Sequence, residues 1–115
     1  MHVLIIEDEP LLAWDLADTL GELGYTSVTI ERTEWAAVAA SRRHWPDLIT
    51  ADYNLVQGTG VGAVRTICAE RSTPVLFITG EPQSVLKLFS SAIVIGKPWS
   101  FTSLSEGIRR CRRQS

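Results

Sequence analysis

The chain has 115 residues, with 11 Lys or Arg and 13 Asp or Glu, and its net charge at pH 7 is −2. This length suits one compact domain with a core of its own and is too short for two. A hydrophobic fraction of 45% and a charged fraction of 21% are ordinary for a water-soluble globular protein. The slightly negative charge gives the chain no general attraction to nucleic acid or to acidic membranes.

The apolar runs and the cysteines both favour a cytoplasmic protein. No apolar run approaches the roughly 20 residues that cross a membrane, and Glu7-Asp8-Glu9 interrupts the apolar start too early for a secretory signal. Cys68 and Cys111 have neither a metal-type nor a CxxC spacing. Both fall at apolar positions of expected helices, which favours small buried side chains over a redox pair.

Short apolar runs alternate with amphipathic stretches five times along the chain, without an internal repeat or a linker. The runs lie at residues 2–6, 26–30, 48–51, 75–78 and 92–95. Each has the length of one strand, and most of them are rich in branched apolar side chains, as buried parallel strands are. The alternation predicts five strands, each followed by a helix.

The first expected helix is the most clearly marked one. Pro10 suits its first position, Gly24 ends it, and four leucines form its apolar stripe: Leu12, Leu16, Leu20 and Leu23. Thr33 can cap a second helix that runs to about residue 44. A third helix is expected after a loop loosened by Gly58, Gly60 and Gly62, and a short fourth helix around residues 84–89. The closing helix has four apolar positions: Phe101, Leu104, Ile108 and Cys111.

Five strand–helix units in a row predict a parallel sheet with helices on both faces, because each crossover is right-handed and must cover the sheet. The fold class is therefore α/β with three layers. The alternation alone does not determine the order of the strands.

Residues with reactive or ionic side chains follow four of the five expected strands. They are Glu7 and Asp8 after the first strand, Asp52 at the third, Thr79 at the fourth and Lys97 after the fifth. The carboxyl ends of parallel strands share one edge of the sheet, where ligands bind. We therefore expect these side chains to lie close together, although they are spread over most of the sequence.

Such a cluster has the groups needed for phosphoryl transfer. Three neighbouring carboxylates oppose one another's ionisation, and a divalent cation removes this conflict; an oxygen-only, partly hydrated set suits Mg²⁺. Lys97 offers a compact positive charge and Thr79 a hydroxyl donor for phosphoryl oxygens. One carboxylate can then attack phosphorus to give an aspartyl phosphate.

Each feature also has an ordinary structural explanation. Acids before Pro10 stabilise the start of a helix, and an Asp after a strand is commonly a turn residue. Thr79-Gly80 and Lys97-Pro98 are common turn and surface sequences. Only their joint placement after four strands favours a functional site.

These residues make the chain similar to a known family over essentially its whole length. It resembles the receiver domains of two-component response regulators. The matching positions are Glu7-Asp8, Asp52-Tyr53-Asn54-Leu55, Gly58, Gly60, Thr79-Gly80 and Lys97-Pro98. The resemblance implies a flavodoxin-like fold whose five strands lie in the order 2-1-3-4-5.

The resemblance also assigns roles to individual residues. It makes Asp52 the phosphoacceptor, and it makes Asp8, Asp52 and the backbone carbonyl of Asn54 the ligands of Mg²⁺, with Glu7 acting through water. Thr79 and Lys97 are expected to contact the phosphoryl group. The peptide bond before Pro98 is expected to be cis.

The partners implied by the family are proteins. The phosphoryl donor is the phosphohistidine of a sensor histidine kinase or of a phosphotransfer protein. Phe77-Ile78-Thr79-Gly80 is similar to a Phe-Ala-Thr-Gly subgroup whose kinases are often of the HWE type. Val94 stands where the family usually has a switching aromatic residue, so the usual rotation of a ring is absent here.

The expected organisation is one receiver domain over residues 1–115, without an effector domain in this chain. Its output is expected to be a downstream protein bound at residues 80–113, with weak dimerisation, or a role as a phosphate sink. The arginines of Arg109-Arg110-Cys111-Arg112-Arg113 favour helix-end and partner contacts over nucleic acid.

Two other functions stay open from the sequence. One is a small phosphohydrolase with an Asp nucleophile, although Asn54 stands where such enzymes need a second acid. The other is a binding module that is never phosphorylated. The complete set of Asp8, Asp52, Thr79 and Lys97 argues against the second alternative, and we do not expect a conventional enzyme.

Overall fold

One sheet of five parallel strands lies at the centre of the protein, whose computed structural model describes residues 1–114. The strands are β1 (His2–Ile6), β2 (Ser27–Glu31), β3 (Leu48–Ala51), β4 (Val75–Thr79) and β5 (Val94–Gly96). Their order across the sheet is β2-β1-β3-β4-β5. The α/β fold class and the strand order implied by the resemblance are both confirmed.

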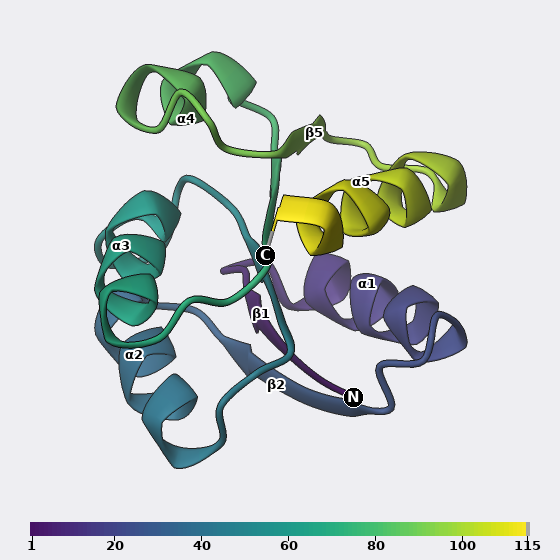
Figure 1. Cartoon of the computed structure of the whole chain (residues 1–115), viewed down its shortest axis with the longest axis horizontal. Helices are drawn as coiled ribbons and strands as arrows, with labels where there is room; N and C mark the ends of the chain where they lie inside the picture. Colours follow the sequence, from purple (N-terminus) through teal and green to yellow (C-terminus); the bar gives the residue numbers. More distant parts are fainter. Residues whose placement is uncertain (115) are drawn as a thin grey trace.

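Five helices cover the two faces of this sheet. They are α1 (Pro10–Glu22), α2 (Glu34–Arg43), α3 (Gly60–Glu70), α4 (Pro82–Leu88) and α5 (Phe101–Gln114). In Figure 1, α1 and α5 lie on one side of the sheet and α2 and α3 on the other, with α4 above them. Each strand therefore lies between helices, which explains why the runs are apolar without strict alternation.

Alternate residues of the strands enter two separate cores, because successive side chains point to opposite faces of a sheet. Val3 and Ile5 of β1 are buried with side chains of α1 and α5. Leu4 and Ile6 are buried with side chains of α2, α3 and α4. The sheet is thus packed against helices on both faces.

Several boundaries differ from those expected from the sequence. The fifth strand is residues 94–96 instead of 92–95, because only these residues pair with β4, whereas the amide of Ala92 donates to Phe89 in a turn. The second strand is shifted by one residue, and α4 begins at Pro82. Gly60 and Gly62 belong to the first turn of α3 and do not form a loose loop.

One position on the closing helix was assigned wrongly. Leu104, Ile108 and Cys111 are buried as expected, but Phe101 is 53% exposed. Phe101 is the first residue of α5, so it lies ahead of the turns that pack on the core. The helical spacing identified the correct face but could not show where contact with the sheet begins.

The two cysteines are packed in the structure as the sequence indicated. Cys111 is buried and Cys68 is partly buried. Burial raises the pKa of the Cys68 thiol and raises that of Cys111 to about 11. Both thiols therefore stay protonated at neutral pH, where they are poor nucleophiles.

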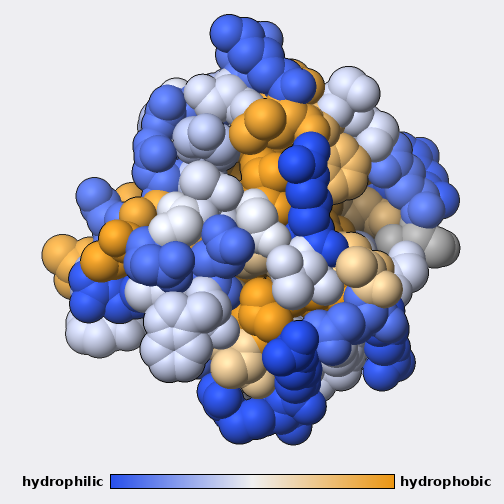
Figure 2. Space-filling view, turned by 90° about the vertical axis from the view of Figure 1, so that its left-hand side faces the viewer, coloured by the Kyte–Doolittle hydropathy of each residue, from blue (hydrophilic) through white to orange (hydrophobic). Residues whose placement is uncertain are grey.

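A pocket of about 620 Å³ opens between α3, the connection from α4 to β5, and the end of α5. Its apolar lining includes Val64, Phe77, Leu88, Phe89 and Ile93. Figure 2 shows hydrophobic residues gathered in the upper and central part of this face, among hydrophilic ones. The pocket adjoins α4, which has only seven residues, through Leu88 at the end of that helix.

Every helix within residues 1–114 is too short or too polar to cross a membrane.

A stacked pair of histidines, the buried His2 and the exposed His44, lies at the opposite end of the sheet from the carboxyl edge. The ring of His2 stacks on that of His44, with 3.7 Å between centroids. The two ring nitrogens of His2 bond to Ser27 Oγ at 2.8 Å and Thr29 Oγ1 at 3.1 Å. Burial, together with the neighbouring His44, lowers the pKa of His2 below its ordinary value.

This pair predicts a loss of stability in mild acid. Because the pKa of His2 is lowered by folding, the unfolded chain binds the proton more readily below about pH 6.5. The free energy of unfolding should therefore fall between pH 7 and 5.5, by up to about 1.4 kcal/mol per pH unit. Urea unfolding at a series of pH values measures this, and His2→Gln should flatten the slope. A wild-type slope in His2→Gln would contradict the assignment.

Candidate functional site

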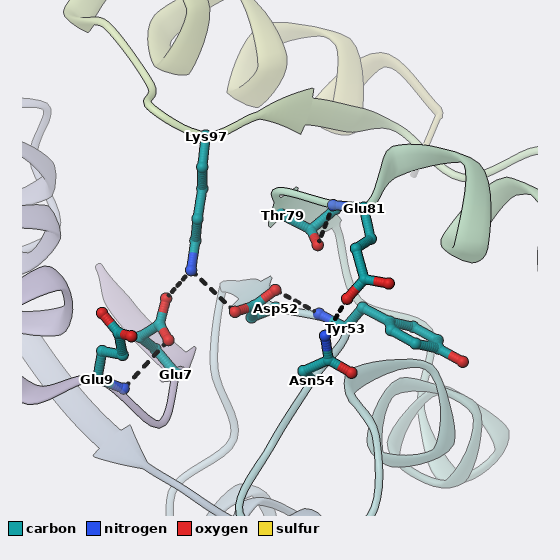
Figure 3. A network of polar contacts seen from close by, with 8 residues as sticks. All are labelled: Glu7, Glu9, Asp52, Tyr53, Asn54, Thr79, Glu81 and Lys97. Atoms are coloured by element: carbon teal, nitrogen blue, oxygen red, sulfur yellow. Dashed lines mark hydrogen bonds and ion pairs between the residues drawn. The ribbon is translucent and has the colours of Figure 1, made fainter.

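The residues singled out from the sequence meet at the carboxyl edge of the sheet. Glu7 and Asp8 directly follow β1, and Asp52 directly follows β3. Thr79 is the last residue of β4, and Lys97 directly follows β5. Figure 3 shows side chains of these elements converging around Asp52. The parallel topology therefore gathers them as expected.

Lys97 is the central cation of this edge. Its Nζ lies 2.6 Å from Glu7 Oε1 and 2.8 Å from Asp52 Oδ2. Burial opposes the charge of Lys97, but the hydrogen bonds that its ammonium donates to Asp52 and Glu7 outweigh this effect, and the pKa of Lys97 is raised. The ammonium thus stays charged at neutral pH and links strands β1, β3 and β5.

Glu7 is the most buried of the acids, with 5% of its surface exposed. Burial raises its pKa, while the hydrogen bonds from Lys97 and from the amide of Glu9 act in the opposite direction. The Glu9 amide donates to Glu7 Oε2 at 3.2 Å. Glu7 is thereby fixed from two sides.

The acids form a group that can hold a metal ion. One carboxylate oxygen each from Glu7, Asp8 and Asp52 lies within 4.8 Å of the others. Within residues 1–114, the ion pairs of Lys97 reach Glu7 and Asp52, and none reaches Asp8. Excess negative charge and oxygen-only donors fit a hard divalent cation such as Mg²⁺.

The main chain also fixes the carboxylate of Asp52. The amide of Tyr53 donates to Asp52 Oδ1 at 2.7 Å, and the amide of Asp52 donates to Ile6 at 3.0 Å. A Cβ added to Gly60 would lie only 1.8 Å from the carbonyl oxygen of Asp52, so α3 can begin here only with glycine. Asp52 is therefore held by β1, by its own loop and by α3.

Thr79 and Asn54 are joined through Glu81, which lies between β4 and α4. The amide of Glu81 donates to Thr79 Oγ1 at 3.0 Å, and the side-chain amide of Asn54 donates to the Glu81 carboxylate. Ser84 in the first turn of α4 donates to Glu81 Oε1 at 3.4 Å. These contacts connect the loop after Asp52 with α4 (Figure 3). The only sequence signal was an acid two residues after Thr79.

The segment around Lys97 agrees with the expectations from the family. The peptide bond between Lys97 and Pro98 is cis. Trp99 packs against the core shared by α1 and α5. Val94 is partly buried against the other core, so its side chain fills space where the family usually has a ring.

Comparison with known proteins agrees with this geometry. The family model of the response regulator receiver domain matches residues 3–109. The chain belongs to this family. PhyR of Methylorubrum extorquens, named a phyllosphere-induced regulator, is 38% identical over 108 residues, covering 90% of this chain and 40% of PhyR. PdtaR of Mycobacterium tuberculosis, a transcriptional regulatory protein, is 32% identical over 93% of this chain and 54% of PdtaR.

Solved receiver structures superpose closely on this one. The receiver domain of Erythrobacter litoralis PhyR has a TM-score of 0.89 at 30% identity, covering 97% of this chain and 89% of that domain. The anti-anti-sigma factor PhyR of Bartonella quintana has a TM-score of 0.84 at 32% identity, covering 98% and 47%. This receiver spans about half, or less, of the length of the curated relatives PhyR and PdtaR.

Membership of the family decides one of the open alternatives. Receiver domains of PhyR-type and PdtaR-type regulators are signalling modules of two-component systems and not conventional enzymes. Membership of this family argues against the phosphohydrolase alternative. The structure adds that Asn54 directs its side-chain amide to Glu81.

The acidic group predicts opposite effects of Asp8→Asn with and without metal. Without metal, removing one of three neighbouring charges should stabilise the fold by about 1 kcal/mol. With excess Mg²⁺ the free energy of unfolding should rise more for the wild type than for the variant. Binding to the folded state adds about 2.7 kcal/mol when the free Mg²⁺ concentration is 100 times the dissociation constant. Urea unfolding of the wild type and the variant, in chelator and in Mg²⁺, measures the effect of the substitution without and with the metal. The same difference in both buffers would exclude Asp8 as a metal ligand.

Proposed function

We propose that this receiver accepts a phosphoryl group on Asp52 from the phosphohistidine of a sensor histidine kinase or a phosphotransfer protein. The reaction is Mg²⁺-dependent and belongs to a cytoplasmic two-component phosphorelay, with residues 1–115 acting as one receiver domain. The observation that carries the proposal is that Asp52 lies 2.8 Å from the Lys97 ammonium and within 4.8 Å of the carboxylate oxygens of Glu7 and Asp8.

The contacts of Asp52 suit a nucleophile held ready for in-line attack. The Tyr53 amide and the Lys97 ammonium each bind one of its two carboxylate oxygens, which fixes the plane of the group. Attack forms a bond between phosphorus and a carboxylate oxygen of Asp52 and breaks the bond from phosphorus to the histidine nitrogen. Since transfer of this kind depends mainly on positioning and charge, a fixed carboxylate is the principal requirement.

Three residues can receive the charge of the transferred group. Lys97 can turn its ammonium from the Asp52 carboxylate to a phosphoryl oxygen, while Glu7 keeps it charged. Thr79 Oγ1 already accepts a hydrogen bond from the Glu81 amide, so its own proton can be donated to phosphate. Asp8, Asp52 and the Asn54 carbonyl, with Glu7 acting through water, would hold Mg²⁺, which would supply further neutralisation of phosphoryl oxygens.

The kinase must bring its phosphohistidine over this edge, and large apolar side chains are exposed beside it. Leu11 is 76% exposed and Trp14 61% exposed on the first turns of α1, and Phe101 is 53% exposed at the start of α5. α1 and α5 lie side by side in Figure 1. Exposed apolar residues of this size mark protein contact surfaces. We assign this surface to the phosphoryl donor, with an HWE-type kinase as one candidate.

The downstream protein is assigned to the face made by residues 80–113. This face includes α4, β5 and α5 and borders the pocket of about 620 Å³ lined by Leu88 and Phe89. Glu81 ties its first helix to Thr79 and Asn54. A change at Asp52 therefore has a physical connection to α4 that does not depend on a ring at position 94.

Phosphorylation is tested by the intact mass after incubation with a small phosphodonor. The wild type should gain one phosphoryl group with Mg²⁺ and lose this gain in chelator. Asp52→Asn should gain none, because an amide cannot act as the nucleophile. Asp15→Asn, an exposed acid on α1, is the matched control and should behave as the wild type. A Mg²⁺-dependent gain that persists in Asp52→Asn would overturn the assignment.

The donor surface is tested by comparing two phosphodonors on Leu11→Ser. Phosphotransfer from a phosphorylated histidine kinase should slow about tenfold, as expected for an apolar anchor at an interface. Labelling by the small phosphodonor should not change, because Leu11 is 76% exposed and is not part of the acidic group. Leu88→Ser, 46% exposed beside the pocket, is the control and should leave both reactions unchanged. Equal slowing in both variants would refute a separate donor surface.

A further inference from the structure

The loop that follows Asp52 is attached to the start of α2, an element without any of the expected site residues. The amide of Glu34 donates to the carbonyl of Gln57 at 3.0 Å, and Thr33 pairs with Gln57 as an isolated parallel bridge. Thr33 also caps α2 by accepting from the amide of Ala36 at 3.2 Å. The first turn of α2 is therefore a fixed point for the middle of this loop.

The side chain of Glu34 makes the second attachment. Its Oε1 accepts a hydrogen bond from the amide of Thr59 at 3.0 Å. Thr59 is the N-cap of α3, so the carboxylate of Glu34 lies at the N-terminus of that helix as well as in the first turn of its own. Both helix dipoles stabilise a negative charge at this position.

Two glycines leave room for this carboxylate. A Cβ added to Gly58 or to Gly62 would lie 2.4 Å from Glu34 Oε1. Gly58 also has φ +76°, which side chains other than glycine rarely adopt. The glycines at these positions thus serve a close approach between α2 and the loop.

The contact with Thr59 leads directly to the expected metal ligand. Thr59 pairs with Asn54 as an isolated antiparallel bridge, and the amide of Gly60 donates to the carbonyl of Tyr53 at 3.0 Å. Asn54 itself is exposed, as is most of the loop up to Gly58. Exposed loop backbone with few contacts moves readily, so the position of the Asn54 carbonyl depends on these few attachments.

We infer that Glu34 is a positioning residue for the metal site. Its carboxylate fixes Thr59, Thr59 fixes Asn54, and the Asn54 carbonyl is thereby held where Mg²⁺ takes its oxygen ligands. Glu34 does not touch the metal or the phosphoryl group. The inference rests on the proposed function, in which Asn54 supplies a backbone ligand.

Two substitutions separate the reach of the Glu34 side chain from its charge. Glu34→Asp keeps the charge but is one methylene too short to hold Thr59, and Glu34→Gln keeps the length and an acceptor oxygen but loses the charge. Glu22→Gln, an exposed acid at the end of α1, controls for the general effect of one negative charge. The dissociation constant for Mg²⁺ alone is measured by calorimetry on all four proteins.

Glu34→Asp should weaken Mg²⁺ binding roughly three- to tenfold, as expected for the loss of one hydrogen bond. Glu34→Gln and Glu22→Gln should each change the Mg²⁺ affinity less than about twofold. Amide exchange without Mg²⁺ should be faster at residues 53–60 in Glu34→Asp only. This readout would not respond to a general loss of stability, which would speed exchange throughout the chain.

The possible results are distinct. Unchanged Mg²⁺ affinity in Glu34→Asp overturns the inference, and weaker binding in Glu34→Gln but not in Glu34→Asp overturns it in favour of simple charge attraction. If the wild type binds no Mg²⁺ and takes no phosphoryl group on Asp52, the proposed function itself fails. A wild type that does both, with all variants equal to it, removes only the role of Glu34.

Discussion

The Lys97 ammonium holds the carboxyl edge of the sheet together. Glu7, Asp8 and Asp52 place three carboxylates within 4.8 Å, and such a group is unstable without positive charge beside it. Lys97 supplies that charge at 2.6 Å from Glu7 and 2.8 Å from Asp52. Lys97 directly follows β5, the edge strand, so the ion pairs also tie the end of the shortest strand to the ends of β1 and β3.

The ammonium balances only part of the negative charge, and this imbalance is what makes the edge suitable for signalling. Two carboxylates share one cation, and Asp8 lies beside them, so in the proposed function this site binds a further cation and, with it, an anionic phosphoryl group. The structure thus keeps a region of unfavourable charge at a rigid edge, supported by two apolar cores. Functional sites commonly retain such local instability, which the rest of the fold offsets.

The site is supported from outside by loops and helices that carry no reactive residue. The close approach of Gly60 to Asp52, the tie from Glu34 to Thr59 and the link from Asn54 to Glu81 all lie around the loop after β3. Together they connect α2, α3 and α4 to the same carboxylate. Gly60 and Asn54 are among the positions that match the receiver family, whereas Glu34 and Glu81 are not among them.

The sequence by itself determined the strand and helix order, the fold class and the residues of the edge. It could do so because parallel strands are buried on both faces and share one carboxyl edge, so Asp52, Thr79 and Lys97 were recognisable from local position. The exact boundaries could not be read from the sequence, because the extent of β5 depends on its pairing with β4. In the same way, the exposure of Phe101 depends on where α5 first contacts the core. Only the tertiary structure decided that Lys97 pairs with two acids, that Glu81 joins Asn54 to Thr79, and that Glu34 holds Thr59. Apart from the short-range contact between Glu81 and Thr79, these contacts join residues 25 to 90 positions apart, and no local pattern in one sequence encodes such distances.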